Sequence, residues 1–173
     1  MAEPENPRRP GSRHVGTGQR TSAVISELVV RSLWHSISIT VLVLLLFQAA
    51  ARPDVRVLRS FIPIEPLGGV VVAGVIFTVA NATLEELVFR GILFDALHSR
   101  WGGGVTLTAM AWLFGLGHLQ GYPPGPLGAC LAASFGFALG ALRLKTDGLA
   151  LPVVAHMAAD AVIYWILVHS SAV

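Results

Sequence analysis

Three charged residues within six positions of an apolar stretch are the strongest candidates for chemistry in this sequence. They are Glu85, Glu86 and Arg90, inside an apolar segment from about Leu67 to Leu97. A charge at the centre of a bilayer costs roughly 2.5–3.5 kcal/mol on insertion scales, so such charges persist where they pair, line a wet cavity or do chemistry.

The spacing of these three residues assigns them different roles on a helix. Glu86 and Arg90 are four residues apart, with the acid first, which is the favourable order for an ion pair. Glu85 points about 100° away from Glu86 and has no basic residue three or four positions from it. We therefore expect a structural Glu86–Arg90 pair and a Glu85 carboxylate that is free to act as a base, the alternative being that Glu85 is a second partner of Arg90.

Three more ionisable residues, His118, His156 and Asp160, lie inside later apolar segments. Counted from the nearest turns, they and the two glutamates lie roughly 10–21 Å deep at 1.5 Å per residue. Each has an ordinary alternative, because a core histidine can bond a carbonyl and His156 can bond Asp160 four residues on. Together, from three helices at similar depth, they favour one shared wet cavity.

The composition is that of an integral membrane protein. Of 173 residues, 54% are hydrophobic and 13% are charged, and the mean hydropathy is +0.68. A soluble domain would carry about 25% charged residues. We predict an all-α, polytopic transmembrane helix bundle over residues 23–173, after a disordered cytoplasmic tail over residues 1–22. No basic stripe indicates nucleic-acid binding.

About five spans are expected, separated by Gly- and Pro-rich breaks at 98–104 and 121–126. Gly136 and Gly140 have the small-xxx-small spacing that permits close helix contact. The expected spans are residues 33–50, 67–97, 105–119, 127–142 and 149–168.

Basic residues near the span ends predict the orientation. Five arginines precede the first span, and Arg100, Arg143 and Lys145 follow the second and fourth. We expect a cytoplasmic N-terminus and a multi-pass location in the plasma (inner) membrane of a bacterium, although three arginines after the first span favour the opposite orientation.

Three short motifs, in this order, resemble those of the CPBP family, also called Abi or CAAX-protease-like intramembrane endopeptidases. Residues 85–90 match EExxxR, residues 114–118 match FxxxH, and residues 156–160 match Hxxx(N/D). The resemblance covers about residues 70–168. It implies a membrane-embedded peptidase that hydrolyses a peptide bond near the C-terminus of a membrane-associated or lipid-modified protein or peptide.

By motif position, the resemblance implies that Glu85 and His118 activate a water molecule. Glu86, held by Arg90, would shape the catalytic pocket. A carboxylate in a cavity of low dielectric is suited to act as a general base.

The resemblance also implies that His156 and Asp160 hold the oxyanion or orient the water. We expect Phe114 to contact the substrate, the alternative from composition alone being ordinary lipid-facing or core packing. Family members often have Asn where this chain has Asp160, and Asn could donate to an oxyanion whereas an ionised Asp cannot. The chain is also shorter than the larger members, so substrate entry and specificity are less well defined than the core chemistry.

The same resemblance leaves the metal question open, since the family is described both as metalloproteases and as glutamate-dependent proteases. If zinc binds, its ligands would be Glu85, His118 and His156, three ligands plus water being a common catalytic set. The HExxH spacing is absent. Because Arg90 beside the carboxylates would oppose a dication, we favour a mechanism without a cofactor.

Two other classes of function compete with a peptidase. The chain could be a catalytically silent immunity or interaction protein, or it could form a proton or ion pathway, which intramembrane Glu, His and Arg also mark. The lack of internal repeats disfavours a secondary transporter. The expected partners are the lipid bilayer and a membrane protein or peptide substrate, and the sequence makes no prediction of oligomeric state.

Overall fold

The computed structural model describes residues 15–63 and 65–170, with side chains from residue 26 onward. These residues form helices and no strand, which confirms the predicted all-α fold. The elements are α1 (Val15–Ala51), α2 (Arg56–Arg59), α3 (Leu67–Glu86), the π-helix η1 (Leu87–Leu93), α4 (Phe94–Gly117), α5 (Gly125–Thr146) and α6 (Ala150–His169).

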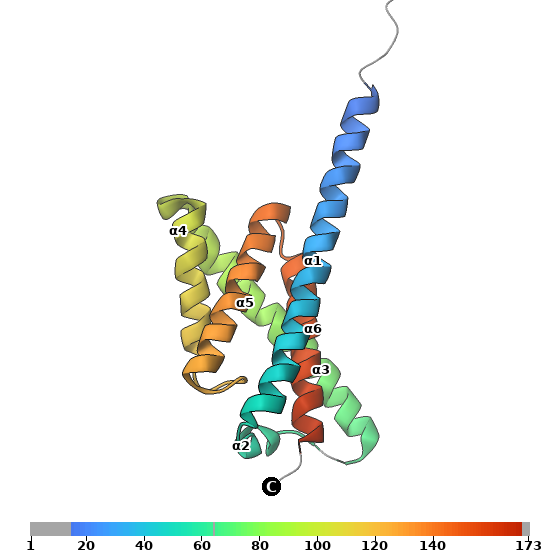
Figure 1. Cartoon of the computed structure of the whole chain (residues 1–173), viewed down its shortest axis with the longest axis vertical. Coiled ribbons are helices and arrows are strands. Elements are labelled where there is room, and N and C mark those ends of the chain that lie inside the picture. Colours follow the sequence, from blue (N-terminus) through green and yellow to red (C-terminus); the bar gives the residue numbers. More distant parts are fainter. Residues whose placement is uncertain (1–14, 64, 171–173) are drawn as a thin grey trace, which may run out of the picture.

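Four of the described segments are long and apolar enough to cross a membrane, which confirms the predicted membrane bundle. They are Ser26–Ala51, Leu67–Gly117, Gly125–Thr146 and Ala150–His169. The second segment has 51 residues, about 76 Å of helix, which is more than twice the ~30 Å hydrocarbon core. It folds back at Gly102, whose φ of 72° suits glycine, so the three single segments and this folded pair make five legs. Figure 1 shows the folded pair as the end of α3 and the descending part of α4.

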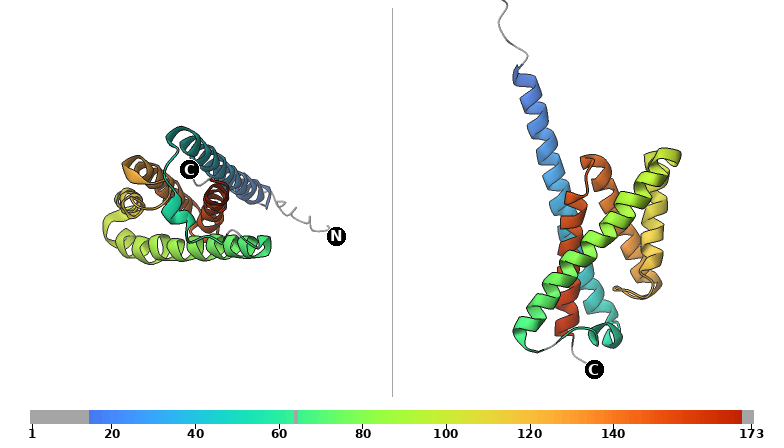
Figure 2. Two further views of the ribbon diagram at one scale, coloured as in Figure 1. Left: turned by 90° about the horizontal axis from the view of Figure 1, so that it is seen from below. Right: turned by 180° about the vertical axis from the view of Figure 1, so that it is seen from behind.

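The ends of the legs alternate between two sides of the bundle (Figures 1 and 2). The start of α1, the turn at Gly102 and the α5–α6 turn lie at one end, whereas α2, the α4–α5 loop and the end of α6 lie at the other. Helix α1 begins at Val15, well before the expected start of the first span at Leu33. Residues 1–14 of the predicted tail lie outside the described residues.

Helices α4 and α5 pack closely through glycines. A Cβ on Gly115 would lie 2.5 Å from the backbone oxygen of Ala129, and one on Gly136 would lie 3.1 Å from the Phe114 ring. The predicted close contact at Gly136 is therefore present. Helix α3 packs against α6, and α1 lies along α5 and α6, so five helices surround the interior that holds the ionisable residues.

Candidate active site

The ionisable residues of the sequence motifs gather where α3 passes into η1. Glu85 and Glu86 are the last residues of α3, and Arg90 lies in η1. π-Helical segments inside α-helices are frequent at functional sites. Helix α6 supplies His156 and Asp160, and His118 is the residue that ends α4.

Glu86 is the centre of a closed hydrogen-bond network. Its carboxylate is fully buried, and Oε1 accepts hydrogen bonds from Arg90 Nη1 and from His156 Nδ1, each at 2.8 Å. The expected Glu86–Arg90 pair is present. His156, 70 positions from Glu86 in the sequence, adds a second hydrogen bond to the same carboxylate oxygen. Both hydrogen bonds end on Oε1, and within the described residues the buried Oε2 of Glu86 has no hydrogen-bond partner. The bond from His156 ties α6 to α3.

Arg90 ties this network to α5. Its Nη2 donates to the carbonyl oxygen of Gly136 at 3.0 Å, and its guanidinium lies 4.3 Å from the centre of the Phe114 ring. A Cβ at Gly136 would come within 3.2 Å of Arg90 Nη2, so glycine at this position leaves room for the guanidinium.

His156 presents its second ring nitrogen to the other acids. Since Nδ1 carries the hydrogen bonded to Glu86, Nε2 is an acceptor in the neutral ring. That Nε2 lies 3.7 Å from Glu85 Oε2 and 3.7 Å from Asp160 Oδ1. His156 thus links the closed network to the side of the site where Glu85 lies.

Glu85 and His118 face each other across the open side of the site. Their Oε2 and Nε2 atoms are 3.9 Å apart, and His118 Nδ1 donates to the carbonyl oxygen of Phe114 at 2.8 Å. Within the described part of the chain, Glu85 Oε2 has no hydrogen-bond partner although the atom is buried. Two imidazole nitrogens therefore converge on one carboxylate oxygen that has spare hydrogen-bonding capacity.

Exposure separates the two adjacent glutamates. The Glu85 side chain is 27% exposed and that of His118 is 22% exposed, whereas that of Glu86 is 0% exposed. Of the two side chains, only that of Glu85 is partly exposed, although its Oε2 atom is buried. This geometry agrees with the expectation that the Glu86 carboxylate is held in a pair and the Glu85 carboxylate is not.

Phe114 is buried between the functional side chains. Its ring lies 4.3 Å from the His118 ring and also contacts His156 edge-on at 5.8 Å. It is 1% exposed, although it lines a cavity. Its clearest structural contribution is to hold the two imidazoles in place, and the sequence-based expectation that it contacts substrate stays a prediction.

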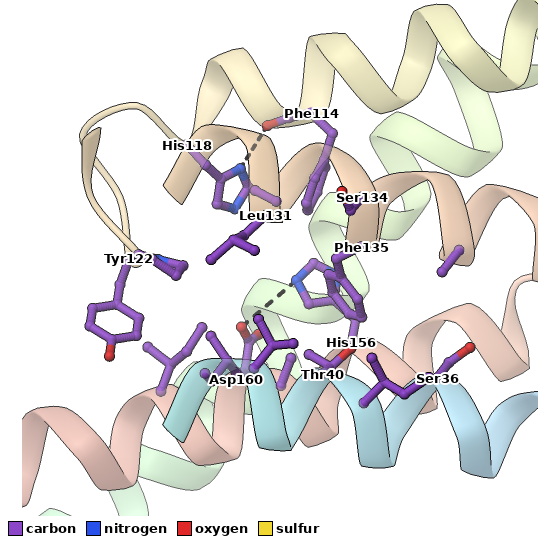
Figure 3. Close-up of a pocket in the computed structure, with 18 of the residues that line it drawn as sticks. Ser36, Thr40, Phe114, His118, Tyr122, Leu131, Ser134, Phe135, His156 and Asp160 are labelled. Atoms are coloured by element: carbon purple, nitrogen blue, oxygen red, sulfur yellow. Dashed lines mark hydrogen bonds and ion pairs between the residues drawn. The ribbon is translucent and has the colours of Figure 1, made fainter. Parts of the chain in front are cut away.

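A cavity of about 260 Å³ opens on one side of the histidines (Figure 3). Ser36 and Thr40 of α1 and Leu131 and Phe135 of α5 form opposite walls, and His118, His156 and Asp160 border it. Most of its lining is apolar. We call it the α1–α5 cavity.

A second cavity of about 360 Å³ lies between α2, α3 and α6. Glu85 and Asn81 line it from α3, and Phe61 lines it from the segment after α2. We call it the α2–α3 cavity. Both cavities are bordered by His118, Tyr122 and Asp160, so the ionisable cluster lies at their junction.

Tyr122 stands at this junction in the α4–α5 loop (Figure 3). Its hydroxyl donates to Gln48 Oε1 of α1 at 2.9 Å, and Gln48 Nε2 donates to Ser170 Oγ at 3.4 Å. Burial raises the pKa of Tyr122 to about 12, so its hydroxyl stays protonated and keeps its role as a donor.

Sequence reasoning missed three residues of this region, Asn81, Tyr122 and Gln48. Asn81 Nδ2 donates to Asp160 Oδ2 at 3.2 Å. The only available signal was that Asn81 precedes Glu85 by four residues on one helix face. Nothing in the sequence pattern connects Gln48 with Tyr122.

The donor types around Glu85 are those that zinc binds, namely one carboxylate oxygen and two imidazole nitrogens whose other nitrogens are anchored by hydrogen bonds. In the described residues, no group of three or more His, Cys, Asp or Glu side chains meets the geometry of a metal site. The donor chemistry therefore suits zinc, whereas the arrangement of the side chains does not form a preassembled site.

A family model described as "Type II CAAX prenyl endopeptidase Rce1-like" matches residues 67–162, more than half of the chain. The match runs from the start of α3 into α6 and includes every motif residue named above. No curated protein and no solved structure matches the chain.

Proposed function

Because the chain belongs to the Rce1-like family of type II CAAX prenyl endopeptidases, which are intramembrane endopeptidases, we propose that Glu85 and His118 activate the hydrolytic water. The substrate would be a peptide bond near the C-terminus of a membrane-associated or lipid-modified protein or peptide. One observation carries this proposal: Glu85 Oε2 has no hydrogen-bond partner in the described structure and has two imidazole nitrogens within 3.9 Å at the junction of two cavities.

Glu85 is the general base. A water beside Glu85 Oε2 can donate one hydrogen to the carboxylate and the other to Nε2 of His118, because His118 holds its own hydrogen on Nδ1. His156 Nε2, on the other side of Glu85, orients the same carboxylate and water. Glu86 stays bound to Arg90 and His156 and keeps the site in shape.

The chemical step is a hydrolysis whose atoms balance within the site. The water oxygen bonds to the carbonyl carbon of the substrate while a water proton passes to Glu85, and the carbonyl electron pair moves to oxygen. When that intermediate collapses, the carbon–nitrogen bond breaks and the proton on Glu85 passes to the leaving amine. The products are a new carboxyl terminus and a released C-terminal fragment.

The two cavities suit the two sides of such a substrate. The α1–α5 cavity is lined mainly by apolar side chains between helices, which favours a lipid chain or apolar side chains. The α2–α3 cavity contains Asn81 and Glu85 and reaches the segment after α2 at the end of the bundle, where the polar peptide can enter. This arrangement supports a substrate that is anchored in the membrane near its C-terminus.

Zinc is the alternative source of an activated water. Glu85, His118 and His156 would hold it, and it would supply Lewis-acid polarisation of a water or a carbonyl. We propose the mechanism without metal, because the buried Arg90 guanidinium next to the acids disfavours a dication. Loss of activity with a chelator, restored by added zinc, would contradict this choice.

The helix ends support the orientation in which the N-terminus is cytoplasmic. Arg100, Arg143 and Lys145 lie near the turns at the end of the bundle where α1 starts, and such residues favour the cytoplasmic side. We propose the inner membrane of a bacterium as its location. Accessibility labelling of cysteines introduced at these turns would test the orientation.

The test of the function uses the purified full chain in detergent and an internally quenched peptide that ends in farnesylcysteine plus three residues, beside its unprenylated twin. Glu85→Gln should lower kcat by about 10²–10⁴-fold, because the general base is lost. Glu27→Gln, a change of an exposed acid on α1, should cleave like the parent chain. A parent chain that cleaves neither peptide would favour the silent membrane protein, and a Glu85→Gln variant of unchanged rate would refute the mechanism.

A further inference from the structure

The proposed hydrolysis requires a hydrogen-bond donor for the negative oxygen that forms on the substrate. Three of the clustered side chains, Glu85, Glu86 and Asp160, are acids that accept hydrogen bonds when ionised. His118 directs its single N–H to the carbonyl oxygen of Phe114. The expected oxyanion roles of Asp160 and His156 therefore need another donor, or need a further proton on one of these two residues.

The other two basic groups of the cluster are engaged elsewhere. In the neutral ring His156 uses its N–H on Glu86, so its Nε2 offers only a lone pair to the site. Arg90 donates to Glu86 and to the carbonyl of Gly136, and it is 1% exposed. These donors stabilise the closed network and point away from the open side of Glu85.

Asn81 supplies a donor on the open side. It lies four residues before Glu85 on α3, hence on the same helix face, and both residues line the α2–α3 cavity with His118. A side-chain amide carries two N–H bonds on one nitrogen. Nδ2 uses one of them on Asp160 Oδ2 at 3.2 Å, and in the described structure the second has no protein acceptor.

Asp160 fixes the orientation of this amide. Its Oδ2 accepts from Asn81, and its Oδ1 lies 3.7 Å from His156 Nε2. Asp160 is 3% exposed, so a reversed amide would set the oxygen of Asn81 against a buried carboxylate, which is repulsive. The acid on α6 therefore keeps the amide nitrogen of Asn81 turned toward Asp160, at the border of the α2–α3 cavity that Glu85 and His118 also line.

We propose that Asn81 is a catalytic residue whose amide donates to the substrate oxyanion, and that Asp160 is the residue that positions it. This inference rests on the proposed function. As the water oxygen bonds to the carbonyl carbon, the carbonyl oxygen gains the electron pair and accepts the free N–H of Asn81. When the carbon–nitrogen bond breaks, that pair returns to the carbonyl, and no proton passes to or from Asn81.

The experiment compares Asn81→Ala and Asn81→Asp with the parent chain on the farnesylated quenched peptide. Asn81→Asp keeps the size of the side chain and removes the donor. Both variants should lower kcat by about 10²–10³-fold, with KM little changed because the bond forms in the transition state. The control Thr83→Ala removes an exposed polar side chain from the same helix and should cleave like the parent chain.

A second change separates a donor from a packing residue. In the Asn81→Ala background, Asp160→Asn places a new amide at the other border of the α2–α3 cavity, and it should recover at least tenfold in kcat, about 1.4 kcal/mol of transition-state binding. No recovery, an unchanged kcat in Asn81→Asp, or a loss confined to KM or to thermal stability would overturn the proposal.

Failure of this inference differs from failure of the proposed function. If the parent chain cleaves the peptide and Glu85→Gln does not, but Asn81→Asp cleaves at the parent rate, then Asn81 is not the donor and the hydrolase proposal stands. If the parent chain does not cleave the peptide, both proposals fall together.

Discussion

Two neighbouring carboxylates in this bundle have opposite surroundings. Glu86 lies in a closed region, where Arg90, His156 and the carbonyl of Gly136 form a continuous network. Glu85, one residue earlier, lies in an open region, where its Oε2 has no hydrogen-bond partner among the described residues and two cavities meet. A helix turn of about 100° between adjacent residues is enough to separate them.

The difference shows how a membrane bundle can hold several charges with separate purposes. In the closed region, pairing offsets the cost of burial, and the network joins α3, η1, α5 and α6. In the open region, Glu85 Oε2 has no hydrogen-bond partner among the described residues, and under the proposed function a water or a substrate would bind there. Changes in the closed region should therefore alter stability first, and changes in the open region should alter activity first.

The largest loss of stability is expected when the hydrogen-bond network around Glu86 is broken. Arg90→Met removes the guanidinium and leaves Glu86 buried with His156 as its remaining hydrogen-bond partner, so the free energy of unfolding should fall by about 3–5 kcal/mol. Equilibrium unfolding in mixed micelles, followed by circular dichroism, measures this loss.

The matched change in the open region is Glu85→Gln. It should leave the free energy of unfolding within about 1 kcal/mol of the parent value, because Glu85 Oε2 forms no hydrogen bond within the described chain. If Glu85→Gln unfolds as easily as Arg90→Met, the division into two regions is wrong.

The Glu86–Arg90 ion pair was predictable from the sequence, whereas the hydrogen bond that His156 adds to Glu86 was not. The spacing of Glu86 and Arg90 is local, so one helical turn is enough to predict their contact. His156 lies 70 residues from Glu86 and Asn81 lies 79 residues from Asp160, and a single sequence contains no signal that pairs residues at such separations. The motif resemblance placed Glu86, His156 and Asp160 in one site without specifying which atoms meet, and it did not include Asn81.

The helices themselves were predicted because apolar runs of sufficient length mark them directly. The π-helix η1 was not, since its sequence LVFRGIL continues the apolar pattern of α3 and only its hydrogen bonding differs. The role of α1 was missed for another reason. Ser36 and Thr40 of α1 line the α1–α5 cavity but lie outside the motifs. Their place in the cavity depends on how α1 packs against α5 and α6.

An effect of intermediate size on stability is expected at the contact between α4 and α5, because α4 positions His118 in the open region. A Cβ at Gly115 would lie 2.5 Å from the backbone oxygen of Ala129, so Gly115→Ala must push α4 away from α5. We expect a loss of about 1–3 kcal/mol in the free energy of unfolding, with a lower kcat because His118 follows three residues later.

The control for that change is Gly117→Ala on the same helix, where a new Cβ meets no atom within 4 Å. It should stay within about 0.5 kcal/mol of the parent in the free energy of unfolding and keep its kcat. Because alanine favours a helix more than glycine does, equal losses in both variants would contradict the assignment of the effect to the α4–α5 contact at Gly115.

The smallest effect is expected where the open region meets α1. Tyr122→Phe removes the hydroxyl that donates to Gln48 and keeps the ring, which packs edge-on against Phe47 at 6.2 Å. One such bond contributes about 0.5–1.5 kcal/mol, so KM for the farnesylated peptide should rise by about 2- to 10-fold with kcat unchanged.

The pH dependence of this effect is a second test. Since burial raises the pKa of Tyr122 to about 12, its hydroxyl stays a donor below that value. The ratio of the parent KM to the Tyr122→Phe KM should therefore not change from about pH 6 to about pH 9. A ratio that changes with pH, or a kcat that falls with KM constant, would place Tyr122 in the chemistry of the open region and not at its border.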